Sequence, residues 1–196
     1  MQGHEVNELH LPENRAKENE ERGLPYLQVK LNVFNVAFHK IEEASLPSAG
    51  DDRTTYGWIP FPSGAFVDML LESFFLLKQD RTKKFLDVGS GIGTKLMLAS
   101  VLFDAHGIEL SDEYIYQSEL LGCKNVIKAD ALQFDRYGEF DLVYFYRPFR
   151  SDQMQKDFEA RLGEMMKPGA LLAPMHTLAD WSANYEQVSN YVWRKK

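Results

Sequence analysis

The feature that most constrains this chain is a run of three alternating glycines, Gly89, Gly91 and Gly93, in the segment KKFLDVGSGIGTKLMLAS (residues 83–100). These glycines follow a short apolar segment and precede a segment of helical character. Glycine permits backbone dihedrals that other residues avoid, and it lets a ligand approach the main chain. The pattern predicts a strand, a binding loop and a helix, with the loop at the strand's carboxyl end, where open parallel sheets bind ligands.

The loop departs from two common phosphate-binding patterns. A Walker loop requires G-K-[ST], whereas Lys95 is followed by Leu96, and Thr94 stands where the dinucleotide fingerprint has its last glycine. Asp87 precedes the loop, and its carboxylate would repel a diphosphate but form a charge-assisted hydrogen bond with an ammonium group. These departures favour a nucleoside that carries an amino acid over a ligand that carries phosphates.

Strand-like and helical segments alternate through the rest of the chain. Such alternation implies right-handed crossovers and a mostly parallel sheet with helices on both faces. We therefore expect an α/β fold, a three-layer sandwich. Strands are predicted at 84–88, 105–110, 125–130, 140–146, 169–175 and 190–196, and helices from Ser63 onward and at 94–103, 111–121 and 151–166.

The N-terminal part differs in character from this α/β pattern. Residues 1–22 are polar, residues 26–44 have apolar side chains at helical spacing, and residues 45–64 are rich in proline and glycine. We expect an extension at 1–55, made of a polar tail, a helix and a loop, and one α/β domain at 56–196. The helix is expected to pack on the domain or on a second copy in a homodimer.

The charge and composition of the chain make some binding partners and cellular locations less expected than others. The net charge is −7, which weakly disfavours a nucleic-acid groove because phosphate contacts need clustered Lys and Arg. The single cysteine, Cys123, is interpreted as a small buried residue. No apolar segment long enough to serve as a signal or to span a membrane is present, and acidic and histidine residues do not cluster at metal-ligand spacing. We expect a soluble, cytoplasmic protein without a metal.

Acidic residues also stand near the ends of three successive predicted strands: Asp87, Glu109 and Asp130. An acid at the end of the second strand suits the two hydroxyls of a ribose. Leu110 is predicted to cover an adenine face, Asp130 to accept a hydrogen bond from an exocyclic amine, and Ala131 to leave room for the ring. A lone acid at a strand end is often only a helix cap, but three with a glycine loop favour a nucleoside site.

The segments FLDVGSGIGTK, GIELS and KADAL resemble the first three motifs of class I S-adenosylmethionine-dependent methyltransferases. The resemblance covers about residues 63–175 and implies a seven-stranded sheet with a reversed last strand. It also implies S-adenosylmethionine as the cofactor, with Asp87 and the loop residues near its methionine end, Glu109 on the ribose and Asp130 near the adenine. The loop residues meant are Gly89, Ser90, Gly91 and Gly93.

The acceptor side is predicted at YFYRPF, the end of the fourth strand. Family members that methylate adenine or a glutamine amide have an acid or amide, two prolines and an aromatic residue here. In this chain Tyr146 replaces the acid or amide, and Arg147 replaces the first proline. Pro148 and Phe149 match the second proline and the aromatic residue. We expect Tyr146 to act in catalysis by orienting the acceptor, to line the site as an aromatic wall near the sulfonium cation, or simply to pack. Arg147 is expected to bind an acidic acceptor or to form a surface ion pair, and Phe149 to contact the acceptor.

Two further segments are candidates for the acceptor side. The aromatic loop with Tyr56, Trp58 and Phe61 either closes over donor and acceptor or plugs the core, and His176 is a possible base. The predicted activity is methyl transfer to a small molecule or a protein side chain rather than to nucleic acid. The alternatives are a protein that binds S-adenosylmethionine without catalysis and an NAD-dependent oxidoreductase.

Overall fold

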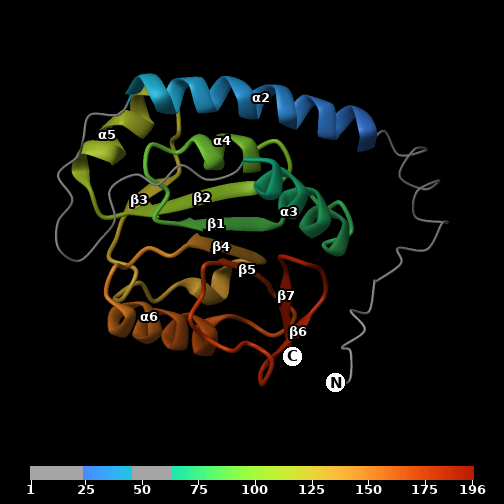
Figure 1. The fold of residues 1–196 in the computed structure, drawn as a ribbon, viewed down its shortest axis with the longest axis vertical. Coiled ribbons are helices and arrows are strands. Elements are labelled where there is room, and N and C mark those ends of the chain that lie inside the picture. Colours follow the sequence, from blue (N-terminus) through green and yellow to red (C-terminus); the bar gives the residue numbers. More distant parts are fainter. Residues whose placement is uncertain (1–23, 46–62) are drawn as a thin grey trace, which may run out of the picture.

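A computed structural model describes residues 24–45 and 63–196 of the chain. In these ranges the elements alternate as an α/β fold requires (Figure 1). They are α2 (Leu24–Ser45), α3 (Ser63–Leu76), β1 (Lys84–Val88), α4 (Thr94–Ala99), β2 (Asp104–Glu109), α5 (Asp112–Leu120), β3 (Val126–Lys128), the 3₁₀ helix η1 (Tyr137–Glu139), β4 (Leu142–Tyr146), α6 (Asp152–Met165), β5 (Leu171–Met175), β6 (Tyr185–Gln187) and β7 (Trp193–Lys195).

The seven strands form one sheet in the order β3-β2-β1-β4-β5-β7-β6. β1 to β5 pair in parallel, whereas β7 pairs antiparallel with both β5 and β6. The predicted seven-stranded sheet with a reversed last strand is therefore confirmed. Because β1 lies at the point where the strand order reverses, the loop after β1 lies where ligands bind in such sheets.

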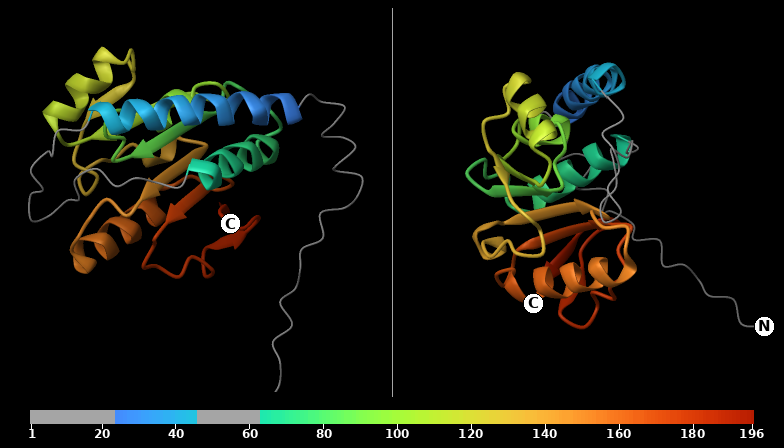
Figure 2. Two further views of the ribbon diagram at one scale, coloured as in Figure 1. Left: turned by 45° about the horizontal axis from the view of Figure 1, so that its top comes forward. Right: turned by 90° about the vertical axis from the view of Figure 1, so that its left-hand side faces the viewer.

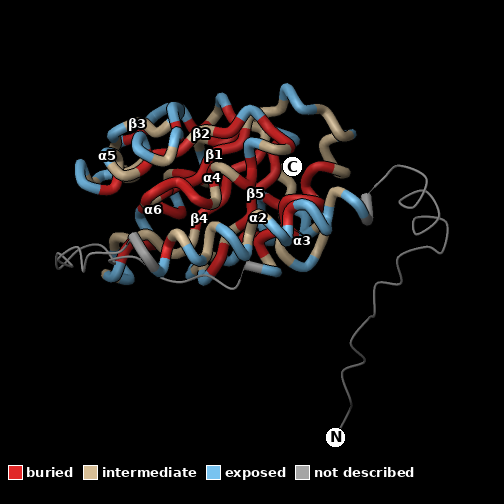
Figure 3. The backbone as a smooth tube through the Cα atoms, turned by 90° about the horizontal axis from the view of Figure 1, so that it is seen from above, coloured by how far each residue is buried: buried red, intermediate tan, exposed pale blue. Residues whose placement is uncertain are grey.

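Alternate side chains of the central strands point to opposite faces of the sheet and build two cores. Phe85, Leu142 and Tyr144 pack on one face with residues of α3 and α4, while Leu86, Val143 and Phe145 pack on the other with residues of α6. Figure 2 shows α3, α4 and α5 on one side of the sheet and α6 on the other. Figure 3 shows the buried strands at the centre of these layers, so the predicted three-layer sandwich is confirmed.

Helix α2 packs within the chain, against both α3 and α4 (Figure 1). Its inner face carries Leu31, which is fully buried, together with partly buried Leu27, Phe34 and Phe38. Its outer face leaves Tyr26, Val29, Val33 and Val36 largely exposed. The expected packing on the domain is thus observed, and a homodimer through this helix stays a prediction.

Several elements differ from the sequence prediction, among them β3, which has three residues instead of six, and η1, which was not predicted. β6 was not predicted, because it has only three residues and pairs only with β7. α4 ends at Ala99 rather than near residue 103, since the chain continues in turns closed by Val101 N–H to Leu98 C=O and Leu102 N–H to Ala99 C=O. β7 is shorter than residues 190–196, so the last two strands are reduced to three residues each.

Candidate donor-binding and active site

The glycine loop joins β1 to α4 at the carboxyl edge of the sheet. Gly89, Gly91 and Gly93 all have positive φ, at 76°, 55° and 84°, which is the region that glycine adopts most readily. The N–H groups of Gly89 and Ser90 donate to the carbonyl of Ile108 at 2.9 and 3.0 Å. The loop is therefore anchored to the end of β2, and nothing lies within 4 Å of the position a Gly91 Cβ would take.

Two residues of the loop serve packing. A Cβ on Gly93 would lie 2.8 Å from the Cys123 sulfur, and a Cβ on Gly107 in β2 would lie 2.6 Å from Ser90 Oγ. The buried Ser90 side chain thus packs over β2, and its predicted donor contact stays a prediction. Cys123 is buried, its thiol donates to the Gly93 carbonyl at 3.5 Å, and burial raises its pKa, which fits the expected packing role.

Asp87 is the most unusual group of this site. It is 2% exposed, and its Oδ2 atom has no hydrogen-bond partner among the described residues. Burial raises the pKa of its carboxyl from 3.8 to about 7; Lys95 opposes this rise, and the negative charges of Glu109 and Glu42 add to it. A buried carboxylate with an unused oxygen lacks a compensating donor or cation.

Glu109 connects the glycine loop to the loop after β2. Its carboxylate accepts the N–H of Gly91 at 2.8 Å and the N–H groups of Leu110 and Ser111 at 2.8 and 3.0 Å. A carboxylate has about four lone-pair positions, so these bonds leave room for about one further donor. The ribose contact predicted for Glu109 stays a prediction; its observed role is to hold two loops together.

The two residues predicted near the adenine lie in the turn after β3. Asp130 Oδ1 accepts the N–H of Leu132 at 2.9 Å, so the side chain caps this turn. The carbonyl of Ala131 accepts the Tyr137 hydroxyl at 2.7 Å. Leu110, predicted to cover the adenine, is 47% exposed beside this edge of the sheet. The structure places all three along the same edge as the glycine loop, and their contacts with a donor stay predictions.

Residues of this edge fit the methionine end of S-adenosylmethionine. The backbone of Gly91 has no neighbour on its open side, which leaves a place for a ligand against the main chain. Asp87 offers an unpartnered carboxylate oxygen, which suits the donor's ammonium group. The loop and the acid are adjacent in the chain, so one ligand can contact both.

The predicted acceptor residues lie at the end of β4. The Tyr146 ring meets the His176 ring edge-on, with centroids 4.9 Å apart. Arg147 donates to Asp152 Oδ1 at 2.5 Å and forms an ion pair with it, which is the second of its two expected roles. Phe149 is buried, and its ring lies 5.7 Å from that of Phe158 under α6. Direct acceptor contacts of these residues stay predictions.

The ends of β4 and β5 carry strained backbone side by side. Arg147 has φ 34° and His176 has φ 53°, in a region that residues other than glycine rarely adopt. The two residues before them, Tyr146 and Met175, are register partners in the parallel pair β4–β5. Such strain clusters at binding sites, where the surrounding structure holds it in place.

A buried polar network that was not among the sequence-based predictions holds these two strand ends together. Gln155 of α6 accepts the N–H of Phe149 at 3.2 Å and donates to Glu159 at 2.7 Å. Glu159, which is fully buried, also accepts the N–H groups of Leu178 and Ala179, the latter at 2.6 Å. Helix α6 therefore fixes both the loop after β4 and the loop after β5.

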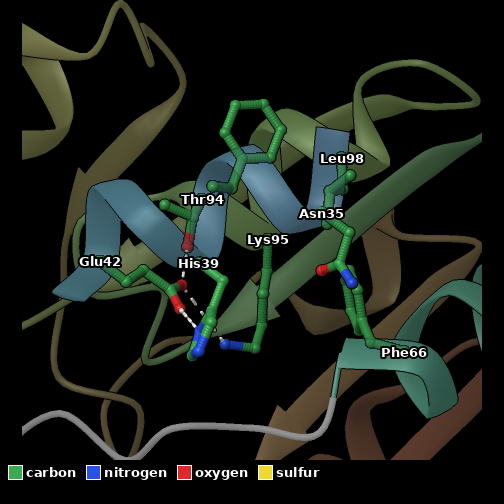
Figure 4. Close-up of a pocket in the computed structure, with 8 residues that line it drawn as sticks. Asn35, His39, Glu42, Phe66, Thr94, Lys95 and Leu98 are labelled. Carbon is green, nitrogen blue, oxygen red and sulfur yellow. Dashed lines mark hydrogen bonds and ion pairs between the residues drawn. The ribbon is translucent and has the colours of Figure 1, made fainter. Parts of the chain in front are cut away.

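Glu42 of α2 was also missed by the sequence analysis. Its carboxylate accepts a hydrogen bond from Thr94, the first residue of α4, and lies 4.0 Å from Lys95 Nζ. These residues line a small pocket between α2, α3 and α4 (Figure 4).

The other predicted acceptor residues, Tyr56 and Trp58, and Phe61 beside them, lie outside the described residues.

The described residues form neither a membrane-spanning helix nor a cluster of metal ligands. No helix in the ranges 24–45 and 63–196 combines the length and the apolar composition that a membrane span needs. In the same ranges, no three His, Cys, Asp or Glu residues come together as a group that could bind a metal ion.

The fold is similar to that of several solved proteins. A proposed RNA methyltransferase, PH1948 from Pyrococcus horikoshii, is 16% identical, with a TM-score of 0.61, and the match covers 85% of this chain and 96% of that one. TehB from Haemophilus influenzae is 13% identical, with a TM-score of 0.51 over 66% of this chain and 62% of TehB.

A further match is CalS10, a SAM-bound amino pentose methyltransferase from Micromonospora echinaspora, at 19% identity, a TM-score of 0.49 and 56% of this chain. This chain spans about half the length of CalS10 and of DesVI from Streptomyces venezuelae, 48% of each. No protein-family model matches the sequence, and no curated protein matches it. At these identities the likeness establishes architecture, and the chain has the Rossmann-like fold of class I S-adenosylmethionine-dependent methyltransferases.

Proposed function

We propose that the chain binds S-adenosylmethionine over the glycine loop and transfers its methyl group to an acceptor at the ends of β4 and β5. The observation that carries the proposal is Asp87. Its carboxylate is buried beside a loop of three positive-φ glycines, and one of its oxygens has no partner among the described residues. A ligand with an ammonium group satisfies this oxygen, whereas a diphosphate is repelled by it.

The chemistry asks little of the protein beyond positioning. The donor supplies an activated methyl group on its sulfonium sulfur, and alignment with the acceptor provides much of the rate enhancement. Asp87 and the backbone of the glycine loop hold the methionine end, and Glu109 holds the loop against β2 while it offers a remaining lone pair to the ribose. Tyr146 places an aromatic ring beside His176 on the acceptor side.

For the acceptor, we propose a small molecule or a protein side chain. The net charge of −7 does not favour a nucleic-acid backbone. The neighbour PH1948 is itself a proposed RNA methyltransferase, so RNA belongs in the acceptor panel as the competing outcome. His176, exposed at the end of β5, is the proposed base where the acceptor holds its proton at neutral pH.

Calorimetric titration with S-adenosylhomocysteine, with NADH in parallel, tests donor binding. Micromolar affinity for the first ligand and none for the second supports the proposed site and excludes the oxidoreductase. Transfer of a labelled methyl group from S-adenosylmethionine to a panel of small amines, phenols, peptides and RNA then identifies the acceptor. Binding of NADH alone, or of neither ligand, contradicts the proposal.

A second candidate is a protein that binds the donor without catalysis. The observations that favour it are the ion pair that engages Arg147 and the burial of Phe149, because both residues are then used for structure. Donor affinity without methyl transfer to any member of the panel supports this alternative. Methyl transfer that Tyr146→Phe or His176→Ala slows at unchanged donor affinity supports the enzyme.

A further inference from the structure

Helix α2 reaches the donor edge of the sheet through one acidic side chain, Glu42. Glu42 lies three residues before the end of α2, and it is 7% exposed. One of its carboxylate oxygens, Oε1, accepts a hydrogen bond from the hydroxyl of Thr94 and lies 4.0 Å from Lys95 Nζ. Figure 4 shows these side chains pointing toward one another from α2 and α4.

Thr94 is the position at which this chain departs from the dinucleotide fingerprint. A glycine there would offer no hydroxyl, and Glu42 would lose its hydrogen bond to the start of α4. Thr94 directly follows Gly93, the last glycine of the loop. The contact thus connects the N-terminal helix to the loop that is proposed to hold the donor.

Glu42 and Asp87 share one electrostatic environment. The charge of Glu42 acts to raise the pKa of the buried Asp87 carboxyl, and the charge of Lys95 acts to lower it. When both acids are ionised, Lys95 balances only one of two buried negative charges. The Nδ1 atom of His39 lies 3.8 Å from Oε2 of Glu42, but the His39 side chain is substantially exposed and carries a charge only when it is protonated. Buried charges without compensation are costly, so the part of the cluster that lies within the described residues, two acids and Lys95, is short of one positive charge.

We propose that Glu42 is part of the donor site: its carboxylate and that of Asp87 together attract the ammonium group at the amino-acid end of the donor. The Oδ2 atom of Asp87, which has no hydrogen-bond partner among the described residues, is the atom left to accept the ammonium group. The N-terminal helix is then a component of the donor site rather than only a cover for α3 and α4. This inference rests on the proposed donor and goes beyond it by assigning Glu42 and α2 to its binding.

The test compares two ligands that differ only at the amino-acid end. S-adenosylhomocysteine carries the ammonium and carboxylate groups, whereas 5′-methylthioadenosine keeps the adenosine and the thioether and lacks both. Glu42→Gln removes the charge but keeps an oxygen that accepts the Thr94 hydroxyl. We expect the variant to bind S-adenosylhomocysteine at least about tenfold more weakly and 5′-methylthioadenosine within about twofold of the unmodified chain.

Glu43→Gln is the matched control. Glu43 is the next residue, is exposed and pairs with Lys40 on the outer side of α2. This variant should bind both ligands as the unmodified chain does. Where Glu42→Gln fails to fold, Thr94→Val removes the hydroxyl that holds the carboxylate and permits the same comparison.

The possible outcomes separate the two proposals. If the unmodified chain binds neither ligand, the proposed function itself is wrong. If the unmodified chain binds S-adenosylhomocysteine and Glu42→Gln leaves its affinity unchanged, only the role of Glu42 is wrong. Equal weakening of both ligands also overturns it, because a purely structural role does not distinguish the ammonium group. Selective loss of S-adenosylhomocysteine supports the inference.

Discussion

Glu159, buried in α6, accepts the backbone N–H of Ala179 at 2.6 Å and so ties the loop after β5 to the helix that follows β4. The same carboxylate accepts the N–H of Leu178 and the side-chain amide of Gln155. Gln155 in turn accepts the N–H of Phe149. The two strand ends proposed for the acceptor are thus held by one acid.

Glu159→Ala should lower the free energy of unfolding by roughly 2 to 4 kcal/mol, because it leaves one buried and two partly buried donors without an acceptor. Denaturant unfolding measures this loss, and hydrogen exchange at the Ala179 amide should become markedly faster. Glu164→Ala, an exposed position of the same helix, is the control and should change stability by less than about 0.5 kcal/mol. Equal stability of the two variants would show that the network contributes nothing.

The pKa of Asp87 makes stability depend on pH in a predictable direction. A carboxyl whose pKa rises from 3.8 to about 7 on folding binds more protons in the folded than in the unfolded state between these values. The free energy of unfolding should therefore fall as pH rises from about 4 to 7, by roughly 4 kcal/mol for this group. Asp87→Asn should be more stable than the unmodified chain at pH 8, and the difference should vanish near pH 4.

Donor affinity should respond to the same group with the opposite sign. A ligand ammonium group favours the ionised form of Asp87, so affinity for S-adenosylhomocysteine should rise as pH increases from about 6 to 8. Calorimetry at pH 6 in buffers of different ionisation enthalpy should detect proton release on binding. A pH-independent affinity in the unmodified chain would contradict the assignment of Asp87 to the ammonium group.

Substitution of Gly91 can distinguish the stability cost of backbone strain from the loss of a contact with the donor. Gly91 and Gly169 both have positive φ, 55° and 79°, and an added Cβ would meet nothing within 4 Å at either position. Gly91→Ala and Gly169→Ala should therefore each cost about 1 kcal/mol of unfolding free energy. Only Gly91→Ala should also weaken S-adenosylhomocysteine, because Gly169 lies before β5, at the opposite edge of the sheet. Equal donor affinity in both variants would remove the donor from the glycine loop.

Much of the fold could be predicted because its signals are local. Apolar runs bounded by turn residues marked β1, β4 and β5, each of which is buried in the middle of the sheet. β6 lacks such a run: two of its three residues, Glu186 and Gln187, are exposed, and its strand character depends on pairing with β7. A strand that exists through its partner carries little signal of its own.

For the residues of the site, too, prediction from the sequence succeeded where they are neighbours in the chain and failed where they are far apart. Asp87 and the glycines are adjacent in the chain, so their combination could be recognised directly. Glu42 contacts Thr94 across 52 positions of sequence. One signal did exist: Glu42 continues the spacing of Leu31 and Phe38, so an acid stood on the face of α2 that was expected to be buried. Gln155 and Glu159 similarly share a face of α6 with Phe158 and Leu162.

The strained end of β4 yields a final prediction. Arg147 adopts φ 34°, and its guanidinium pairs with Asp152, which is mostly exposed. An exposed ion pair contributes at most about 1 kcal/mol, so Arg147→Ala should lower stability little through the lost charge and should keep the backbone strain. Arg147→Gly loses the same ion pair but relieves the strain, so it should be more stable than Arg147→Ala by up to about 1 kcal/mol.

Thermal and denaturant unfolding of the two variants measure this difference directly. Asp152→Ala serves as the control, because it removes the ion pair and leaves the side chain at position 147 intact. A glycine variant that is less stable than the alanine variant would show that the backbone at position 147 is unstrained. Strain that is confirmed there, next to Tyr146 and opposite His176, would mark the ends of β4 and β5 as a site held in place by the Gln155–Glu159 network rather than by local preference.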